Sequence, residues 1–527
     1  MMNHKLRYTS SNIVEIIIVV LILVVINYVG YRFFQRFDMT ENKQFTISQA
    51  TKDILGRMDD PVNVEMFLST DLPPQFMRVR DEVRDRLDEY VAYGRGQFKL
   101  KITDPGDDDA EKERAMQLGV RELEVQITER DALSVKKVFF GLVLSFEDRT
   151  ETIRTEELVD PTGMEYALTN RLVKLTMEKK PKIGLFVGPF TTSEQQQPPS
   201  YEGLRQVLSG PDGMYEIVMI DAQADRQLPD DLDAVIIAGA FGMGESMKYS
   251  IDQFIMNGGQ VLVTLDPIMQ PQQQGMELTA YPSLPTIEDQ LEKYGVKLTK
   301  QLVADISCAQ APMSMGMFQV YREYYLWPQI GPTGFNKEVG AVAQLESLVL
   351  PWCCPLSTIE IPGVSAATLA TSTDEAFTLS SPFSLNPEQD WVFLKSSAES
   401  TGPYDLICMV SGDIPSAFPD GPPAENQPAG ADEPVTLAPT FDPSAHKDMA
   451  VGGRVVVIPS EKALSDMFLR QFNQNVLFTV NLMDMMLLGD ELLGIRSTPV
   501  TARPLKQLSD AEKSSCVDDA TRGPVGD

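Results

Sequence analysis

Four short strand-like segments, separated by helical stretches, limit the folds open to this chain more than any other feature of its sequence. They lie at 183–187, 215–221, 233–238 and 261–265, and most of their residues are apolar. Continuous apolar strands are buried on both faces, which is typical of a parallel sheet covered by helices. The sequence therefore predicts an α/β fold with a parallel sheet at 182–305.

Binding sites in such sheets lie at the carboxyl ends of the strands. Here those ends carry Gly239, Gly242, Gly244 and Asp266. The glycines have neither dinucleotide-binding nor P-loop spacing, and we interpret them as a strand-to-helix turn. Asp266 has no nucleophile beside it, and we interpret it as a cap for the turn that follows. These four residues form the candidate ligand or partner surface. No catalytic residue, cofactor or metal site is predicted.

An apolar run near the N-terminus predicts a membrane anchor. With its flanks, the run 13–34 reaches the ~20 residues that cross a bilayer core, and 16–31 carries no charge. No small-x-small cleavage pattern follows, so we expect an uncleaved anchor rather than a signal peptide. Lys and Arg are balanced on the two sides, and the short tail favours a cytoplasmic N-terminus. The anchor is marked by Ile16, Leu21, Ile26, Tyr28 and Tyr31.

Changes in pattern divide the rest of the chain. The Gln- and Pro-rich stretch 268–285 is predicted to be a loop, and 460–488 a pair of apolar helices after a buried strand at 454–458. The predicted units are a cytoplasmic tail 1–12, the anchor 13–34, a small α/β domain 38–180, the parallel-sheet domain 182–305, a mixed α/β extension 306–414, a flexible Pro/Asp-rich loop 415–450, a closing strand and helices 451–496, and a polar tail 497–527.

Charge, histidine and cysteine content exclude several classes of function. The 527 residues include 75 Asp+Glu and 45 Lys+Arg, a net charge of −30, so no nucleic-acid partner is expected. His4 precedes the anchor, which leaves only His446 for the body of the protein. Histidine triads and multi-histidine metal sites are thereby excluded. The five cysteines contain no C-x-x-C pair; one disulfide is compatible with the sequence, but its pairing is open.

Two acidic groupings have a structural and a functional interpretation. The cluster 104–109 contains four aspartates that could attract Ca²⁺, but it lacks the spacing of an EF-hand. We interpret it as a turn followed by a helix N-terminus. Asn481, Asp484 and Asp490 surround the last helix. A solvated face is the expected explanation, with contact to a partner as the alternative.

Several segments together resemble one known family. Residues 36–48 read RFDMTENKQFTIS and resemble the R-x-D-L-T-x-x-K-x-Y-T-L-S start of the GldG-like family. Members of this family are membrane-anchored auxiliary components of ABC transporters, named after gliding motility. Other similar segments follow in the family's order at 233–239, 258–267, 291–296, 302–305, 416–419, 481–484, 489–490, 495–496 and 503–505.

The resemblance implies a central domain similar to class I glutamine amidotransferases, a flavodoxin-like fold, without catalysis. An amidotransferase needs a Cys on the turn after a central strand and a downstream His that activates it. Residues 238–246 contain no Cys, and His446 lies in the Pro/Asp-rich loop. The resemblance also implies an ABC permease and its separate ATPase as partners, besides membrane lipid. We therefore expect a non-catalytic, single-pass subunit in the bacterial cytoplasmic (inner) membrane, its body facing the periplasm or cell exterior.

Two alternatives and one departure from the family stay open. A membrane-tethered envelope hydrolase could use paired carboxylates without histidine. A polysaccharide- or solute-binding module is the other alternative. Family members commonly have a second membrane helix after the Arg-Pro-Leu segment, whereas this chain is polar beyond about residue 513. Whether such a helix has been lost is not decided by the sequence.

Overall fold

The computed structural model describes most of the chain between Ile47 and Leu488. The predicted anchor at 13–34, with Ile16, Leu21, Ile26, Tyr28 and Tyr31, lies outside the described residues. No helix in the described part of the chain combines the length and apolar composition needed to span a bilayer. The gaps within 47–488 are 130–131, 160–163, 189–199, 211–212, 222–226, 241–242, 270–271, 275–276, 316–317, 399 and 424–440.

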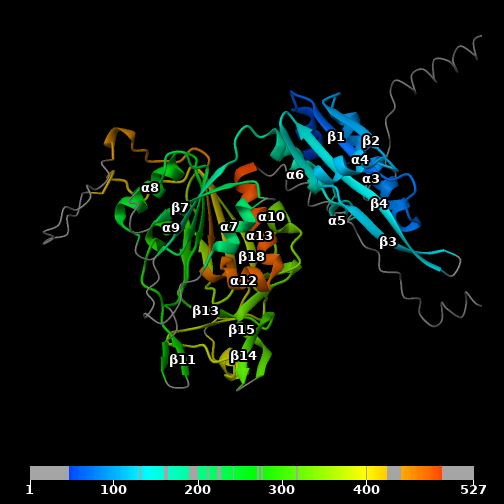
Figure 1. The fold of residues 1–527 in the computed structure, drawn as a ribbon. Helices are drawn as coiled ribbons and strands as arrows, with labels where there is room; N and C mark the ends of the chain where they lie inside the picture. The colour runs from blue at the N-terminus through cyan, green and yellow to red at the C-terminus, as the bar shows by residue number, and fades with distance from the viewer. Residues whose placement is uncertain are drawn as a thin grey trace, which may run out of the picture. The chain divides into compact units, whose positions relative to one another are not determined.

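The first domain is built on a five-stranded sheet with the order β2-β1-β4-β3, in which β5 also pairs with β4 (Figure 1). Strand β1 runs parallel to β2 and antiparallel to β4. Alternate residues of β1 enter the core, as a half-buried strand requires. The elements are α2 (Gln49–Gly56), β1 (Val62–Leu68), α3 (Pro74–Tyr93), β2 (Phe98–Thr103), α4 (Asp109–Gln117), β3 (Glu122–Glu129), β4 (Ala132–Phe146), β5 (Arg149–Ile153), α5 (Thr155–Val159) and α6 (Met164–Thr176).

The central domain contains the predicted parallel sheet. Its five parallel strands lie in the order β7-β6-β8-β9-β22, which is 2-1-3-4-5 in chain order and a common doubly wound arrangement. The α/β fold class is thus confirmed. The strands and their helices are β6 (Lys182–Val187), α7 (Glu202–Ser209), β7 (Glu216–Asp221), β8 (Ala234–Ala238), α8 (Glu245–Met256), β9 (Gln260–Thr264) and β22 (Gly453–Ile458).

Side chains of the parallel strands alternate between two cores, one on each face of the sheet. In β8, Ile236 belongs to one core, while Val235 and Ile237 belong to the other. Helices α7 and α13 contribute to the first core, and α8 and α9 to the second. Both faces are therefore covered, which explains why these strands read as continuous apolar runs.

Antiparallel strands widen the central sheet beyond β22. Strand β21 runs antiparallel to β22 and also pairs with β17 and β18. After β22 the chain forms a 3₁₀ helix of 4 residues and then two α-helices, as the sequence pattern predicts. The elements are α9 (Glu288–Tyr294), β12 (Val296–Leu298), β17 (Leu356–Thr358), β18 (Val364–Thr371), β21 (Asp405–Gly412), η3 (Glu461–Leu464), α12 (Asp466–Gln471) and α13 (Asn473–Leu488).

Most of the remaining strands form three smaller sheets, β10-β11-β20, β13-β19 and β14-β15-β16, next to an aromatic core. The loop prediction for 268–285 is wrong in part, because β10 and β11 lie within it and pair with each other, and β11 also pairs with β20, about a hundred residues later. Such long-range pairing has no local sequence signal. The elements are β10 (Gln272–Gln274), β11 (Glu277–Ala280), β13 (Leu302–Ala304), β14 (Cys308–Met315), β15 (Phe318–Ile330), η1 (Pro332–Gly334), α10 (Gly340–Ala343), β16 (Leu348–Val349), β19 (Phe377–Leu379), β20 (Phe383–Ser384), α11 (Trp391–Ser396) and η2 (Pro443–Ala445).

Candidate functional site

Two of the predicted glycines lie in the turn between β8 and α8. Gly239 directly follows β8 with φ +73°, a backbone conformation that favours glycine. Its amide donates to the carbonyl of Thr264, the last residue of the neighbouring strand β9. Gly244 is the N-cap of α8 and has open space around it. Gly242 lies outside the described residues. The two glycines thus have different environments, and only Gly239 lies against other side chains.

The space beside Gly239 is filled by the side chain of Glu461. A Cβ atom at Gly239 would lie 2.7 Å from Glu461 Oε2 and 2.8 Å from its carboxyl carbon. Glu461 comes from η3, which follows β22, so two strand ends meet here. An elbow that carries a nucleophile needs room for a side chain at this kind of turn. In this chain a carboxyl group takes that room.

Asp266 joins the same group of residues, after β9. It accepts a hydrogen bond from the backbone N–H of Glu461 at 3.1 Å and forms an ion pair with Lys462. The Asp266 and Lys462 side chains are only 11% and 14% exposed. The partners of Asp266 therefore lie almost two hundred residues later in the chain. The sequence predicts instead that Asp266 caps the turn at Pro267.

The environment of Glu461 favours the protonated form of its carboxyl group. Burial, with the nearby charge of Asp266, raises the pKa of Glu461 to about 8, although Lys462 and the Tyr201 hydroxyl act in the opposite direction. The Tyr201 hydroxyl donates to Glu461 Oε1 at 3.0 Å. Burial also raises the pKa of Tyr201 well above its usual value, as do the charges of Glu461 and Asp266. A carboxyl group with a raised pKa thus lies beside one that forms an ion pair.

Further contacts connect this group to its surroundings. Asp466 at the start of α12 accepts a hydrogen bond at 2.7 Å from the backbone N–H of Gly203 in α7. The Lys462 ammonium lies 5.3 Å from the centre of the Trp352 ring. We call Tyr201, Gly239, Asp266, Glu461 and Lys462 the strand-end cluster. Each polar side chain of the cluster makes at least one hydrogen bond or ion pair within the chain, so the cluster connects β8, β9, α7 and η3.

The sequence indicates Asp266 and Gly239 but misses Tyr201, Glu461 and Lys462. A signal for two of them exists, because Ser460-Glu461-Lys462 comes directly after the buried-looking strand 454–458. The rule that sites follow the carboxyl ends of parallel strands applies to this fifth strand too. Tyr201 has no comparable signal, since it precedes a helix and reaches the cluster only through the tertiary fold.

The cysteines and His446 lie in other environments. The four described cysteines, Cys308, Cys353, Cys354 and Cys408, have free thiols, and burial raises the pKa of each, for Cys308 to about 11 and for Cys408 to about 12. His446 Nδ1 lies 3.0 Å from the Tyr249 hydroxyl, and Nε2 lies 3.2 Å from Asp448. Thiols with raised pKa values are poor nucleophiles.

Asp252 is a buried carboxylate that the sequence does not single out. Its side chain accepts hydrogen bonds from Tyr294, Ser416 and Ala417, each at 2.7 Å. Tyr294 and the 416–417 pair come from two of the segments that resemble the GldG-like family.

Both ends of the predicted flexible loop are bonded to each other. The backbone N–H of Ser416 donates to the carbonyl of Asp448, and the backbone N–H of Ala450 donates to the carbonyl of Ile414.

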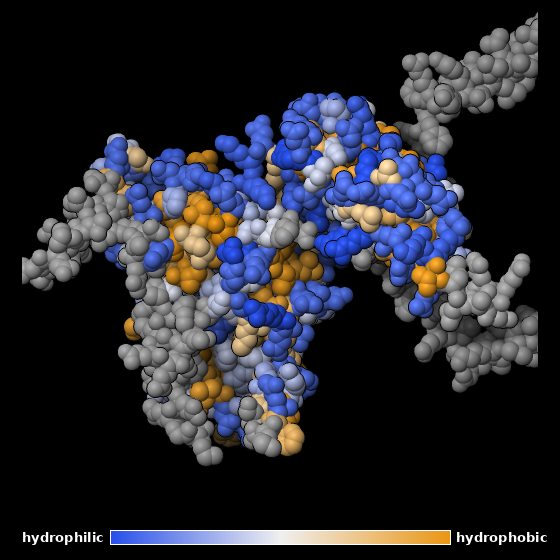
Figure 2. Space-filling view, in the orientation of Figure 1, coloured by the Kyte–Doolittle hydropathy of each residue, from blue (hydrophilic) through white to orange (hydrophobic). Residues whose placement is uncertain are grey.

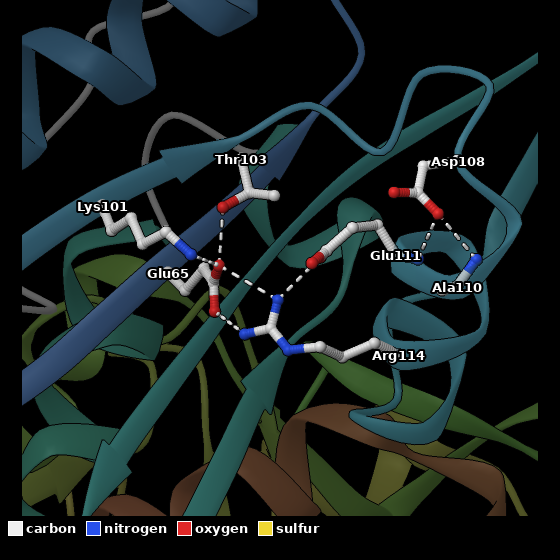
Figure 3. Close-up of polar contacts among 7 residues, drawn as sticks. All are labelled: Glu65, Lys101, Thr103, Asp108, Ala110, Glu111 and Arg114. Atoms are coloured by element: carbon white, nitrogen blue, oxygen red, sulfur yellow. Dashed lines mark hydrogen bonds and ion pairs between the residues drawn. The ribbon is translucent and has the colours of Figure 1, made fainter.

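The first domain holds a second charged cluster, around Glu65 on β1 (Figure 3). Lys101 and Thr103 on β2 bond to Glu65 at 2.8 and 2.5 Å, and Arg114 on α4 forms an ion pair with it. Burial alone would raise the pKa of Glu65, but the hydrogen bonds from Arg114, Lys101 and Thr103 lower it to about 2. The cluster connects three elements and is satisfied internally.

The acidic cluster 104–109 forms the expected turn and helix start. Asp108 is the N-cap of α4, and its carboxylate accepts from the N–H groups of Ala110 and Glu111 (Figure 3). Asp104 accepts from Thr70 and Gly106. Across the described residues, no group of three His, Cys, Asp or Glu side chains is arranged to hold a metal ion.

The expectation of a solvated face on the last helix is wrong. Asn481 and Asp484 on α13 are 4% and 1% exposed, while Asp490 lies outside the described residues. Asp484 accepts hydrogen bonds from the hydroxyls of Tyr215, at 2.6 Å, and Tyr166, at 2.8 Å. These residues are polar because they bond inside the fold, which a charge pattern alone does not reveal.

Comparison with known proteins gives two family matches. A family described as "ABC-type uncharacterized transport system" matches residues 180–487, which is more than half of the chain. A domain family of unknown function matches residues 41–145. The first match covers the central domain and its strand-end cluster, and the second covers much of the first domain.

An individual relative and a solved structure are also similar to this chain. An uncharacterized protein from Borreliella burgdorferi is 24% identical over 330 residues, which are 62% of each protein. The chain thus spans about three fifths of the length of the curated relative it matches. The exo-β-1,4-mannosidase Op5Man5 from Opitutaceae bacterium strain TAV5 aligns at 10% identity and a TM-score of 0.24, over 77% of this chain and 49% of that one. A TM-score this low carries no inference.

Proposed function

The chain belongs to the family described as ABC-type uncharacterized transport system, and from this membership we propose that it is a non-catalytic auxiliary subunit of such a system. The observation that carries the proposal is the match over 180–487, because it covers the whole central domain. The GldG-like segments quoted above extend the similarity to the region that follows the predicted anchor.

The proposal includes attachment to a membrane. The apolar run 13–34 supports a single-pass anchor in the bacterial cytoplasmic membrane, with the acidic body on the periplasmic or outer side. The partners we propose are the permease of the system, with its separate ATPase subunit, and membrane lipid. No P-loop occurs in the sequence, so ATP hydrolysis is assigned to another subunit.

The strand-end cluster supports the non-catalytic part of the proposal. The doubly wound sheet is of the kind expected for an amidotransferase-like domain, in which the nucleophile follows a central strand. At that turn this chain has Gly239, and the Glu461 carboxyl group fills the space next to it. Because Tyr201 bonds to Glu461 and Asp266 pairs with Lys462, we propose that the cluster fixes the ends of the strands and does not carry out chemistry.

Co-purification tests this function. The tagged full-length protein is extracted from membranes of its native host in a mild detergent, and bound proteins are identified by mass spectrometry. We expect a multi-span permease and an ABC ATPase to be recovered together with it. Recovery without either component would contradict the proposal. A variant with Glu461→Gln should retain both partners and full transport, because the carboxyl group has no catalytic role.

One observation favours a second function, that of a membrane-tethered envelope hydrolase. The raised pKa of Glu461, beside an Asp266 that forms an ion pair with Lys462, resembles the division of roles in an acid–base pair. Hydrolysis of envelope glycans or peptides by the purified protein, abolished by Glu461→Gln, would establish this function. An inert wild-type protein would eliminate it.

A further inference from the structure

Helix α6 lies between the two parts of the chain that match different families. The matches cover 41–145 and 180–487, and α6 (Met164–Thr176) belongs to neither. Both domains nevertheless belong to the same compact unit, Ser48–Pro499. The helix packs against β4 and β5 of the first domain (Figure 1). Its remaining contacts therefore bear on how the two domains are joined.

Glu165 attaches α6 to the start of the first domain. Its side chain is 2% exposed and accepts hydrogen bonds from the backbone N–H of Ser48 and the hydroxyl of Thr51, each at 2.7 Å. Arg86 of α3 donates to its other oxygen at 3.3 Å. Ser48 is the N-cap of α2, and Thr51 lies in its first turn. A buried carboxyl group that loses its partners is strongly destabilising, so these bonds resist any shift of α6 against α2.

Tyr166, the next residue, attaches α6 to the central domain. Its hydroxyl accepts a hydrogen bond from the Asn170 amide at 2.7 Å and donates one to Asp484 of α13 at 2.8 Å. Val173 and Met177 pack against the core of the central domain to which α7 and α13 contribute. These four residues recur at intervals of three or four positions, which places them in one stripe along the helix.

The two sides of α6 thus have different partners. A helix at the surface of a domain normally buries one side only. The face of the first domain seen in Figure 2 is largely hydrophilic, whereas α6 has buried residues from its first turn to its last. Asp484, like Glu165, is almost fully buried, at 1% exposed. Each domain therefore has one buried carboxyl group with a hydrogen bond that involves α6.

We propose that α6 couples the two domains, so that a disturbance of the Glu165 contacts reaches α13 and a disturbance of the Tyr166 contacts reaches α2. Since α2 follows the predicted anchor in the sequence, a displacement at the anchored end would then be transmitted to α13. The inference goes beyond the proposed function and does not depend on it, because it concerns contacts within the chain.

Hydrogen–deuterium exchange, measured by mass spectrometry on the full-length protein in a mild detergent, tests the coupling. Tyr166→Phe and Tyr215→Phe each remove one hydroxyl group from Asp484, but only Tyr166 lies on α6. We expect Tyr166→Phe to accelerate the exchange of amides in α2 by roughly 3- to 30-fold, the effect of a coupling of usual size. Tyr215→Phe should accelerate exchange in α13 and leave α2 unchanged.

The reverse direction provides the second measurement. Glu165→Gln should accelerate amide exchange in α13, although the hydrogen bonds of this carboxyl group described above are to α2 and α3. The control, Glu65→Gln, weakens a carboxylate cluster of β1, β2 and α4 in the same domain and should leave α13 unchanged. Circular dichroism verifies that the variants fold, and the comparison of the two tyrosines decides the matter if Glu165→Gln does not.

Two outcomes would overturn the inference. Unchanged exchange in α2 of the Tyr166→Phe variant would show that the domains respond independently. Equal acceleration in α2 by Tyr166→Phe and Tyr215→Phe would show that the effect spreads from Asp484 by a route other than α6. If the coupling is found but no transport subunit co-purifies with the wild-type protein, the proposed function fails while this inference stands.

Discussion

At Gly239, backbone conformation and side-chain packing constrain the same residue. Its φ of +73° disfavours any residue with a Cβ atom, and Glu461 occupies the position that such an atom would need. Gly244, five residues later, has neither constraint. The two glycines are equivalent in the sequence, and only the structure shows that Gly239 is constrained and Gly244 is not.

Substitution of Gly239 should therefore destabilise the fold. We expect Gly239→Ala to lower the free energy of unfolding by ~1–3 kcal/mol from backbone strain alone, with the clash against Glu461 adding to this. Urea denaturation followed by circular dichroism measures the change. Gly244→Ala is the matched control and should change stability by less than ~0.5 kcal/mol. Equal effects of the two substitutions would contradict the assigned geometry.

The protonated state of Glu461 gives the protein a particular dependence on pH. The pKa of Glu461 is raised from 4.5 to about 8 in the folded chain, so the native state holds a proton that the unfolded state releases. This contribution to stability is complete below pH 4.5 and is lost as the pH rises to about 8.

Glu461→Gln should remove this dependence, because glutamine does not ionise. In the wild-type protein, Glu461 should lower the free energy of unfolding by up to ~1.4 kcal/mol for each pH unit between 4.5 and 8. Urea denaturation at pH 5, 6, 7 and 8 should give a flatter profile for the variant. Glu202→Gln, at an exposed residue paired with Arg205, should retain the wild-type slope.

Elements of the first domain are held by carboxylates at defined positions. Asp108 caps the start of α4, and Glu65 connects β1 to β2 and α4 (Figure 3). The two carboxylates stabilise the domain in different ways, since one satisfies backbone N–H groups and the other balances side-chain cations. Each therefore has its own test.

Loss of the cap should destabilise α4. We expect Asp108→Ala to lower the free energy of unfolding by ~1 kcal/mol, because two backbone N–H groups lose their acceptor. Asp107→Ala, one residue earlier, is the control and should have little effect. Thermal unfolding with and without millimolar Ca²⁺ completes the test. Stabilisation by Ca²⁺ that disappears in the Asp108 variant would restore the cation-binding interpretation of 104–109.

Acid should weaken the connection made by Glu65. Its pKa in the folded chain is about 2, below its usual value of 4.5, so its contribution is present above pH 4.5 and lost as the pH falls towards 2. We expect Glu65→Gln to lower the free energy of unfolding at pH 7. The variant should then lose less stability than the wild-type protein as the pH falls. Denaturation midpoints at pH 3, 4 and 7 measure this. Glu113→Gln, on the exposed side of α4, is the control.

At the scale of the whole molecule, the extension and the central domain share one aromatic core. Phe468 of α12 packs at 4.8 Å, between ring centres, against Trp327 of β15, and Trp352 lies nearby. All three tryptophans of the chain are in the extension. Tryptophan fluorescence therefore reports on this lobe, whereas circular dichroism reports on every element.

Removal of the Phe468 side chain should destabilise the extension and the central domain together. We expect Phe468→Ala to cost ~3–5 kcal/mol, as is usual for a buried phenylalanine, and to shift the fluorescence and circular dichroism transitions by similar amounts. Met467→Ala, at the adjacent and 54% exposed residue, is the control and should leave both unchanged. A shift in fluorescence alone would show that the lobe unfolds independently.

The parts of the fold with a local signal are predictable from the sequence. Apolar runs predict the buried strands of the central sheet, and the acidic residues 104–109 predict a turn followed by a helix N-terminus, because these signals act over a few positions. The neighbours of these elements are not predictable in this way. Glu461 reaches Gly239 across more than two hundred residues, and Asp484 finds its tyrosines only in the folded chain. These contacts depend on tertiary packing, which has no period in the sequence.

The position of β22 has a consequence for the synthesis of the protein. This strand completes the parallel sheet beside β9, but the ribosome makes it almost two hundred residues after β9. Until then, the growing chain carries a sheet with an open edge and an unfinished core on both faces. Folding that depends on such distant pairing is slow and leaves the nascent chain prone to aggregation. Chaperones that bind nascent chains should therefore engage this protein between the appearance of β9 and that of β22.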